Sequence, residues 1–353
     1  MYSKQLFIKI LIISLAISCA EKEKKVEVVE KDKKLRALII DGQNNHYIWP
    51  KTTLMMKDYL EDTDLFEVDV RRTDSVWLGV KYNQSRPEAY NYFIDTFILD
   101  TVNRGRSNQP IKSSNFKIDF SNYDVIVSNL GMGATEWPEE TRKAFEKYVS
   151  NGGGLVTVHA ADNSFPKWTE YNKMIALGGW GERDSISGPY VYYNSEGEVE
   201  YDYTQGPGGS HGLESEFVIT TREQSHPVMN GLPEKWLHTQ DELYERLRGP
   251  FENATILATA FSDEEGNAPP WDPNQKGMGQ NVPMIMAIDY GKGRVFHTTL
   301  GHFDYSMECA GFITILQRGA EWASTGEVTQ AVPNDFPTES KTSSRSWDYK
   351  MEE

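Results

Sequence analysis

Short apolar runs that end at glycine or polar residues recur along the chain, with amphipathic segments between them. They are Leu35–Ile40, Phe66–Val70, Val125–Asn129, Leu155–Val158 and Arg294–Thr299. A run of this length, bounded by turn residues, is typical of a strand buried on both faces of a sheet. Strands that alternate with helical segments predict an α/β fold, with a mostly parallel sheet and helices on both faces.

The segments between these runs predict where the helices lie. Apolar residues recur at helical spacing over about residues 49–60, 138–151 and 306–323. The glycines at 152–154 would end the second of these helices. From Gly178 to Leu213 the sequence is rich in glycine, tyrosine and serine, and we expect loops and hairpins over one face of the sheet there.

The first residues are expected to direct export of the protein rather than to fold. Residues 1–18 contain Lys4 and Lys9, no acidic residue, and an apolar run that is too short to span a membrane. The segment resembles a bacterial lipoprotein signal that ends before Cys19, although Ala16 stands where such signals usually carry leucine. We expect cleavage before Cys19, lipidation of its thiol, and a lipid anchor in the cell envelope, on the outer membrane facing the periplasm or the surface. A plain secretory signal is the alternative.

The expected domain organisation has four parts. Residues 1–18 form the signal peptide, 19–34 a charged tether, 35–325 the folded domain, and 326–353 a polar C-terminal tail that is loosely attached. Once Cys19 carries lipid, Cys309 is the only remaining thiol, so no internal disulfide is expected.

The charge balance restricts the partners. Lysine and arginine total 36 and aspartate and glutamate total 52, which gives a formal net charge of −16. A chain this acidic, without a basic patch, is expected to repel nucleic acid and anionic lipid headgroups. We therefore expect a small-molecule partner, no nucleic acid, and membrane contact only through the lipid anchor.

Three of the seven histidines follow predicted strands. His46 follows the first strand, His159 follows Leu155–Val158, and His302 follows the last strand. Loops at the C-terminal ends of parallel strands meet in one crevice, so these imidazoles are expected to lie close together. His226 and His297 are interpreted as structural residues.

Imidazoles beside carboxylates favour two kinds of chemistry. A neutral imidazole exchanges a proton near pH 7, and Asp241 and Glu242, which follow His238 closely, can orient it or act as the partner acid. His159 and His302, together with a carboxylate, can instead hold a divalent metal. The residues alone do not choose between these alternatives.

Other chemistries lack their motifs. The chain contains no C-x-x-C pair and no H-x-x-x-H spacing. Gly131-Met132-Gly133 and the glycines at 152–154 have neither a P-loop lysine nor G-x-G-x-x-G spacing. A dinucleotide cofactor is therefore not expected.

Short motifs spread along the chain resemble the trehalose-utilisation (ThuA-like) family. They are Gly42-Gln43 with His46 and Trp49, GGLVTVHAA at 153–161, His226-Pro227, DELY at 241–244, GKGRVF at 291–296, Gly301-His302, and EWA at 321–323. The match covers residues 35–325. The resemblance implies the fold of class I glutamine amidotransferases, a flavodoxin-like sandwich.

The same resemblance excludes one activity. Amidotransferases carry a nucleophilic cysteine at the turn after the strand that here is Leu155–Val158, whereas this chain has His159 there. Cys309 lies in the predicted last helix. Without a thiolate at the turn no glutamyl thioester can form, so glutaminase activity is excluded. His302 stands at about the place of the amidotransferase histidine.

The resemblance further implies a carbohydrate-processing enzyme that hydrolyses or eliminates 3-keto-glycosides, in a pathway shared with a sugar oxidoreductase. A ketone at C3 acidifies the C2 proton, so a base can remove it and expel the aglycone from C1. On this hypothesis His159 and His302 share base and electrophile or metal-ligand roles. Glu242, with Asp241, orients a histidine or serves as the acid.

Further side chains are expected to contact the sugar. They are Gln43, Asn44, His46, Asn163 and His238 as polar partners, and Trp49, Trp137 or Trp180 as stacking platforms. Two other functions stay open: a keto-sugar isomerase or epimerase that uses the same enolate chemistry, and a non-catalytic, lipid-anchored glycan-binding protein.

Overall fold

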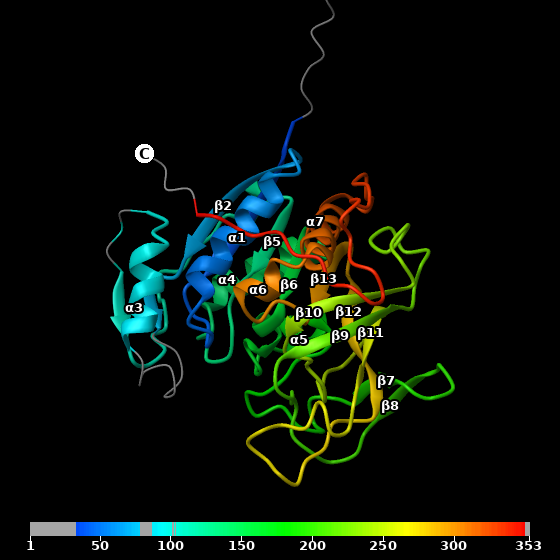
Figure 1. Ribbon diagram of the computed structural model, residues 1–353. Coiled ribbons are helices and arrows are strands. Elements are labelled where there is room, and N and C mark those ends of the chain that lie inside the picture. Colours follow the sequence, from blue (N-terminus) through cyan, green and yellow to red (C-terminus); the bar gives the residue numbers. More distant parts are fainter. Residues whose placement is uncertain (1–32, 78–86, 101, 103, 350–353) are drawn as a thin grey trace, which may run out of the picture. The chain divides into compact units, whose positions relative to one another are not determined.

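The computed structural model describes residues 33–77, 87–100, 102 and 104–349 (Figure 1). The predicted signal peptide, its Cys19 lipidation site and nearly all of the tether lie outside the described residues. From Lys34 onward the chain forms one compact unit.

The core of this unit is an 11-stranded sheet with the strand order β10-β9-β11-β12-β13-β6-β5-β1-β2, and with β7 and β8 joined to it at β12. Its parallel half consists of β1 (Leu35–Asp41), β2 (Phe66–Arg72), β5 (Val125–Ser128), β6 (Gly154–Val158) and β13 (Gly293–Thr298). These five strands are the apolar runs that the sequence predicts. The fold class is confirmed.

Beyond β13 the sheet continues with antiparallel strands. They are β7 (Tyr190–Tyr193), β8 (Val199–Asp202), β9 (Ser215–Thr221), β10 (Lys235–Asp241), β11 (Ala254–Ser262) and β12 (Gln280–Tyr290). A separate two-stranded sheet pairs β3 (Ser75–Trp77) with β4 (Gly105–Ser107). The expected hairpin after Gly178 is present as β7 and β8.

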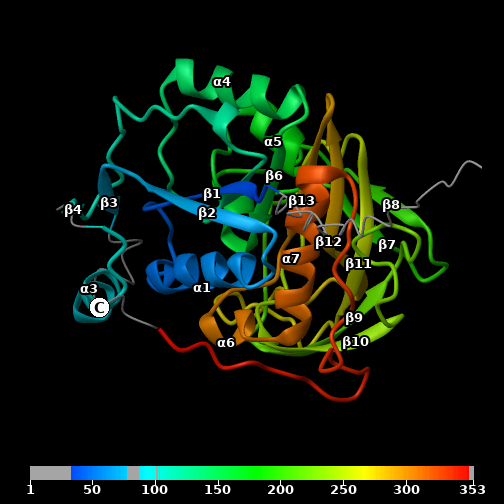
Figure 2. The ribbon, with the colours of Figure 1, turned by 90° about the horizontal axis from the view of Figure 1, so that it is seen from above.

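Helices cover both faces of the parallel half (Figure 2). The first face carries α1 (Trp49–Glu61) and α7 (Ala310–Thr325), and the opposite face carries α4 (Glu139–Ser150) and α5 (Thr169–Ile175). Each amphipathic helix buries its apolar side, for example Met56 and Leu60 of α1 on one face and Phe145 and Val149 of α4 on the other. The remaining helical segments are α3 (Pro87–Thr96), α6 (Asp304–Met307), η1 (Phe120–Asn122) and η2 (His159–Asn163).

The end of the chain differs from the expectation in two respects. The predicted closing helix is divided into α6 and α7, and Cys309 lies between them at the start of α7 rather than within a helix. The tail is not loosely attached, because it runs along α6 and α7 (Figure 2). The N–H of Leu237 donates to the carbonyl of Thr338 at 2.8 Å, and the indole N–H of Trp347 donates to Asp58 at 2.8 Å.

No helix within the described ranges combines the length and the apolar character that crossing a membrane requires.

A buried ion pair fixes the C-terminal ends of β1 and β2. The guanidinium of Arg72 donates to both carboxylate oxygens of Asp41, at 3.0 and 2.9 Å, and the two side chains are 5% and 0% exposed. Thr53 of α1 donates to the same carboxylate at 2.8 Å, and Arg72 lies over the Trp49 ring. The pair therefore joins two strands and a helix directly before the loop that carries His46.

Replacing Arg72 with methionine should strongly destabilise the protein. The change leaves the Asp41 carboxylate buried without its cation, which costs about 3–5 kcal/mol in the free energy of unfolding. Urea denaturation measures the loss. Arg71→Met is the matched control, because Arg71 pairs with Asp74 at the surface and its loss should cost about 0–1 kcal/mol. Equal effects of the two substitutions would contradict this account of the buried pair.

Candidate active site

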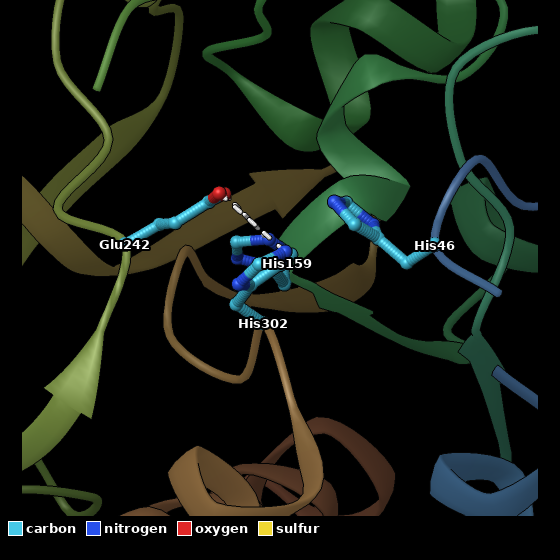
Figure 3. Close-up of side chains that lie close together, drawn as sticks. All are labelled: His46, His159, Glu242 and His302. Atoms are coloured by element: carbon cyan, nitrogen blue, oxygen red, sulfur yellow. Dashed lines mark ion pairs between the residues drawn. The ribbon is translucent and has the colours of Figure 1, made fainter. Parts of the chain in front are cut away.

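Four side chains from separate loops converge beyond the strand ends, and we call them the histidine cluster: His46, His159, Glu242 and His302. His46 follows β1, His159 follows β6, His302 follows β13, and Glu242 follows β10. One nitrogen or carboxylate oxygen from each lies within 4.8 Å of the others. Figure 3 shows the imidazoles of His159 and His302 side by side, with the Glu242 carboxylate and the His46 ring directed toward them. The structure thus brings together the three histidines that the sequence places at strand ends and Glu242, which the sequence analysis selects because it follows His238 closely.

His159 has a strained backbone that aims its side chain into the cluster. Its φ is 47°, in the left-handed region that non-glycine residues rarely adopt, and this strain is typical of functional turns after strands. The ring Nδ1 lies 2.7 Å from the carbonyl of Thr299, which can only accept a hydrogen bond. Nδ1 therefore carries the proton, and Nε2 faces the cluster, 2.8 Å from the Tyr244 hydroxyl.

His302 is oriented in the same way by a carboxylate. Its Nδ1 lies 2.5 Å from Glu214, which also accepts a 2.5 Å hydrogen bond from the hydroxyl of Tyr305. Because Nδ1 donates to Glu214, Nε2 is the nitrogen that faces Glu242, at 3.4 Å. Sequence reasoning missed Glu214, which lies just before β9 and far from any predicted parallel strand.

Glu242 is the acidic member of the cluster and is 8% exposed. Its Oε2 lies 3.6 Å from Nε2 of His159 and has no hydrogen-bond partner. Burial alone would raise the pKa of Glu242, but the imidazoles of His159, His302 and His211 lower it below its usual value.

The pKa values of His159 and His46 shift in opposite directions. Burial lowers the pKa of His159, but the carboxylates of Glu242 and Asp241 more than offset this and the net shift is upward. His46 has no such carboxylate support. Its pKa lies well below the usual value, because of burial first and of the neighbouring imidazoles second.

Asp241 and His238 lie behind the cluster rather than in it. The carboxylate of Asp241 is fully buried and accepts hydrogen bonds from the backbone N–H groups of Gly301 and His302, at 2.7 and 3.0 Å. His238 is also fully buried, with Nε2 2.8 Å from Asp241. The prediction that His238 contacts substrate is therefore corrected. Asp241 acts by positioning the loop that carries His302.

Several predicted sugar contacts are used for internal packing instead. Gln43 and Asn44 are almost fully buried and bond to neighbouring loops, Gln43 to Thr135 and Asn44 to the carbonyls of residues 129 and 130. Trp49 donates its indole N–H to Tyr90 and is 1% exposed. Trp137 lies within an aromatic core beside α4. Because these side chains are buried and bonded or packed within the protein, they support the loops of the crevice, which corrects their assignment as sugar contacts.

A histidine and a tryptophan that sequence reasoning missed flank the cluster on its exposed side. Nδ1 of His211 donates to the carbonyl of Gly212 at 2.8 Å, so its Nε2 lone pair faces Glu242 at 3.5 Å. The ring centroid of His211 lies 4.7 Å from that of Trp271, which is 57% exposed. Burial lowers the pKa of His211. The only sequence signal for His211 was the composition of residues 178–213, which are rich in glycine, tyrosine and serine, and Trp271 had no such signal.

Two predicted contacts remain beside this flank. Trp180 is half-buried, with its ring 4.7 Å from that of Tyr244 and 5.9 Å from that of His211. Asn163 is buried near the Tyr244 hydroxyl, and its Oδ1 has no hydrogen-bond partner. Trp180 is placed to meet a ligand that enters beside the cluster, whereas Asn163, which is 3% exposed, lies behind it next to Tyr244.

The residues around His211 include the spacing G-x-S-x-G at 208–212, which in hydrolases can mark a nucleophilic serine. Ser210 does not lie at a strand-to-helix turn. It is 3% exposed, and its hydroxyl accepts a 2.6 Å hydrogen bond from Gln275. It therefore does not serve as a nucleophile in this arrangement.

A small cavity of about 10 Å³ lies against the cluster, and its lining includes His46, His159, His302, Asn44, Trp49, Thr52 and Asn129. Larger cavities lie elsewhere, one of about 510 Å³ beside Tyr148 and one of about 800 Å³ beside Trp347 and α1. Neither of these is lined by a histidine. The titratable side chains that could do chemistry are concentrated at the cluster.

Comparison with known proteins identifies relatives. The family model for ThuA, described as trehalose utilisation, matches residues 101–323. The solved structure of a ThuA-like protein from Parabacteroides merdae is 42% identical, with a TM-score of 0.73, and the match covers 89% of this chain and 98% of that one. A ThuA-like protein from Bacteroides uniformis is 15% identical, with a TM-score of 0.48 and coverage of 84% and 93%. No protein with a curated description matches.

Proposed function

The chain belongs to the ThuA family of trehalose utilisation, and from that premise we propose that it cleaves glycosides that carry a ketone at C3 of the sugar ring. The observation that carries the proposal is the convergence of His159, His302 and Glu242 beside the exposed flank of His211 and Trp271. This arrangement supplies the groups that proton abstraction next to a ketone requires.

The proposed reaction has two steps. A base removes the C2 proton, the electrons form an enolate at the C3 oxygen, and the enolate expels the aglycone oxygen from C1 as that oxygen takes up a proton. Water then adds to C1 of the resulting enone, and C2 is reprotonated. The sum is one glycoside and one water converted to one 3-keto-sugar and one alcohol, without an external oxidant or reductant.

The cluster supplies the electrophile in this scheme. Negative charge develops on the C3 oxygen in the transition state, and fixed positive charge beside it lowers the barrier. The Nε2 atoms of His159 and His302 face the same space, and each ring is locked by a hydrogen bond at Nδ1. Positive charge held at these atoms, by protons or by a cation, would stabilise the enolate.

His211 is the base of the proposed reaction. Its Nδ1 is committed to the Gly212 carbonyl, which leaves the Nε2 lone pair free, and its side chain is 18% exposed at the edge of the cluster. After it takes the C2 proton, the imidazolium can return a proton to the departing aglycone oxygen. Trp271 offers an exposed aromatic face next to His211 for the sugar ring.

The proposed substrate requires an earlier oxidation. A ketone at C3 arises when an oxidoreductase removes hydride and a proton from a glycoside hydroxyl, so such an enzyme would supply the substrate. We also propose that the protein works in the cell envelope, anchored through lipid on Cys19.

The first test is turnover of 3-keto-trehalose or a 3-keto-glucoside by the purified protein. We expect equal amounts of released alcohol or glucose and of 3-keto-sugar, detected by chromatography. In heavy water the recovered 3-keto-sugar should carry deuterium at C2. Deuterium exchange at C2 with no release of aglycone would instead identify an isomerase or epimerase. Saturable binding of the substrate without exchange or release would identify a binding protein, and either result overturns the proposed cleavage.

His211→Asn should lower kcat by about 10²- to 10⁴-fold, the usual contribution of a general base. Asparagine can still donate to the Gly212 carbonyl, so the loop should keep its conformation. His226→Asn is the control, because His226 packs on Trp322, at the far end of α7, and is expected to leave kcat unchanged. A kcat for His211→Asn within threefold of the wild-type value would remove His211 from the mechanism.

Trp271→Ala should raise KM more than it lowers kcat. An aromatic stacking contact contributes about 0.5–1.5 kcal/mol, which corresponds to roughly a 2- to 12-fold change in KM. Steady-state kinetics on the same keto-glycoside measures both constants. Tyr92→Ala, on the exposed side of α3, is the matched control and should change neither. An unchanged KM for Trp271→Ala would show that the sugar does not stack there.

A further inference from the structure

We propose that His46, His159, Glu242 and His302 bind one divalent transition-metal ion. This metal would serve the proposed function as a cofactor. The geometry of the four side chains indicates a metal whatever the substrate is. His159 and His302 were expected to ligate a metal from their places in the sequence, and the structure adds the other two ligands.

The tautomers of two histidines leave the Nε2 lone pairs on the side of the cluster. Nδ1 of His159 donates to the Thr299 carbonyl and Nδ1 of His302 donates to Glu214, so in the neutral rings both Nε2 atoms are acceptors. Nε2 of His159 accepts the Tyr244 hydroxyl at 2.8 Å, whereas Nε2 of His302 faces Oε1 of Glu242, which is also an acceptor, at 3.4 Å. Acceptors that converge in a buried space repel one another unless a proton or a cation lies between them.

The distances favour a metal ion over a shared proton. The two Nε2–Oε separations are 3.4 Å for His302 and 3.6 Å for His159. Both exceed the usual length of a charge-assisted hydrogen bond, about 2.7–2.9 Å. Two ligand atoms that are each about 2.1 Å from one tetrahedral ion lie roughly 3.4 Å apart. The two separations, to Oε1 and Oε2 of Glu242 respectively, are near this value, and one ligand atom from each of the four residues lies within 4.8 Å of the others.

An unsatisfied carboxylate oxygen gives an independent indication. Oε2 of Glu242 is buried and has no hydrogen-bond partner. Buried carboxylate oxygens are normally satisfied, because an unpartnered one loses its hydration without compensation. A cation bound within the cluster supplies the missing interaction.

The surroundings of the imidazoles match those of metal-binding histidines. Such histidines donate their second ring nitrogen to a carboxylate or a backbone carbonyl, which fixes the ring and increases its basicity. The Glu214 carboxylate accepts this hydrogen bond from Nδ1 of His302, and the Thr299 carbonyl accepts it from Nδ1 of His159. The Tyr244 hydroxyl, which bonds to Nε2 of His159, has the unpartnered Oδ1 of Asn163 as an alternative acceptor when that nitrogen binds metal.

The ligand set indicates the class of metal. Three imidazoles and one carboxylate suit zinc, iron, cobalt or nickel, whereas magnesium and calcium prefer an all-oxygen shell. Such an ion is a Lewis acid that polarises a carbonyl oxygen. It would supply the positive charge that the proposed reaction needs at the C3 oxygen.

The test is metal binding by the full chain, measured without any sugar. The protein is stripped with a chelator, dialysed, and titrated with Zn²⁺ by calorimetry, and with Co²⁺ by visible absorption. We expect one equivalent of each metal, a cobalt d–d band with nitrogen-ligand character, and a higher thermal unfolding temperature with Zn²⁺. A stoichiometry near zero, or Zn²⁺ affinity no better than millimolar, would overturn the proposal.

Variants locate the ion. Glu242→Gln and His302→Ala should weaken Zn²⁺ binding by at least about 100-fold. Glu214→Gln should weaken it by about 10- to 100-fold, because Glu214 contacts His302 at Nδ1, the nitrogen that faces away from the metal. His226→Ala, the surface control, should bind Zn²⁺ like the wild type. Circular dichroism checks that each variant is folded, and Glu242→Gln, which preserves shape, carries the test if His302→Ala does not fold. Unchanged affinity in Glu242→Gln would place the metal elsewhere and overturn the site.

The two proposals can fail separately. If the protein binds one Zn²⁺ at the cluster but neither exchanges nor cleaves 3-keto-glycosides, the metal site is supported and the proposed function is overturned. If it cleaves them equally well after chelation, with no bound metal, the function is supported and the metal site is overturned.

Discussion

Asp241 joins the two halves of the sheet at the point where the site is built. Its buried carboxylate accepts hydrogen bonds from the backbone of Gly301 and His302, and from the imidazole of His238. Asp241 ends β10, an antiparallel strand, whereas Gly301 and His302 follow β13, which belongs to the parallel half. The same bonds therefore fix the loop of His302 and the start of the loop that presents Glu242. A buried carboxylate persists only with such partners, so the placement of acid against imidazole depends on this one group.

The parallel half and the histidines at its strand ends could be predicted from the sequence. A strand buried on both faces is a continuous apolar run, which is a strong signal, and the parallel arrangement then brings the residues after each run to one edge of the sheet. For this reason His46, His159 and His302 were placed together although more than 250 residues separate the first from the last. Glu242 was found by its proximity to a histidine in the chain, but that histidine, His238, lies in the interior.

The rest of the site could not be predicted, for physical reasons. An antiparallel strand such as β11 or β12 has the same apolar pattern as a parallel one, so the sequence does not reveal how the sheet continues past β13. His211 and Trp271 lie in loops without periodicity and meet only because those loops fold back over the cluster. Trp49 was wrongly assigned to the site. The sequence does not distinguish an aromatic residue that faces a sugar from one that, as here, covers a buried arginine.

The turn after β6 determines which group the strand end presents. His159 has a positive φ directly after the strand, a strained conformation that aims its imidazole into the cluster. An imidazole in this position cannot form a thioester, but it reaches further than a thiol, and the Thr299 carbonyl fixes which nitrogen it presents. Cys309, the cysteine within the described residues, is buried behind the site near His238. The turn therefore presents a lone pair of fixed direction, which suits proton transfer or metal binding.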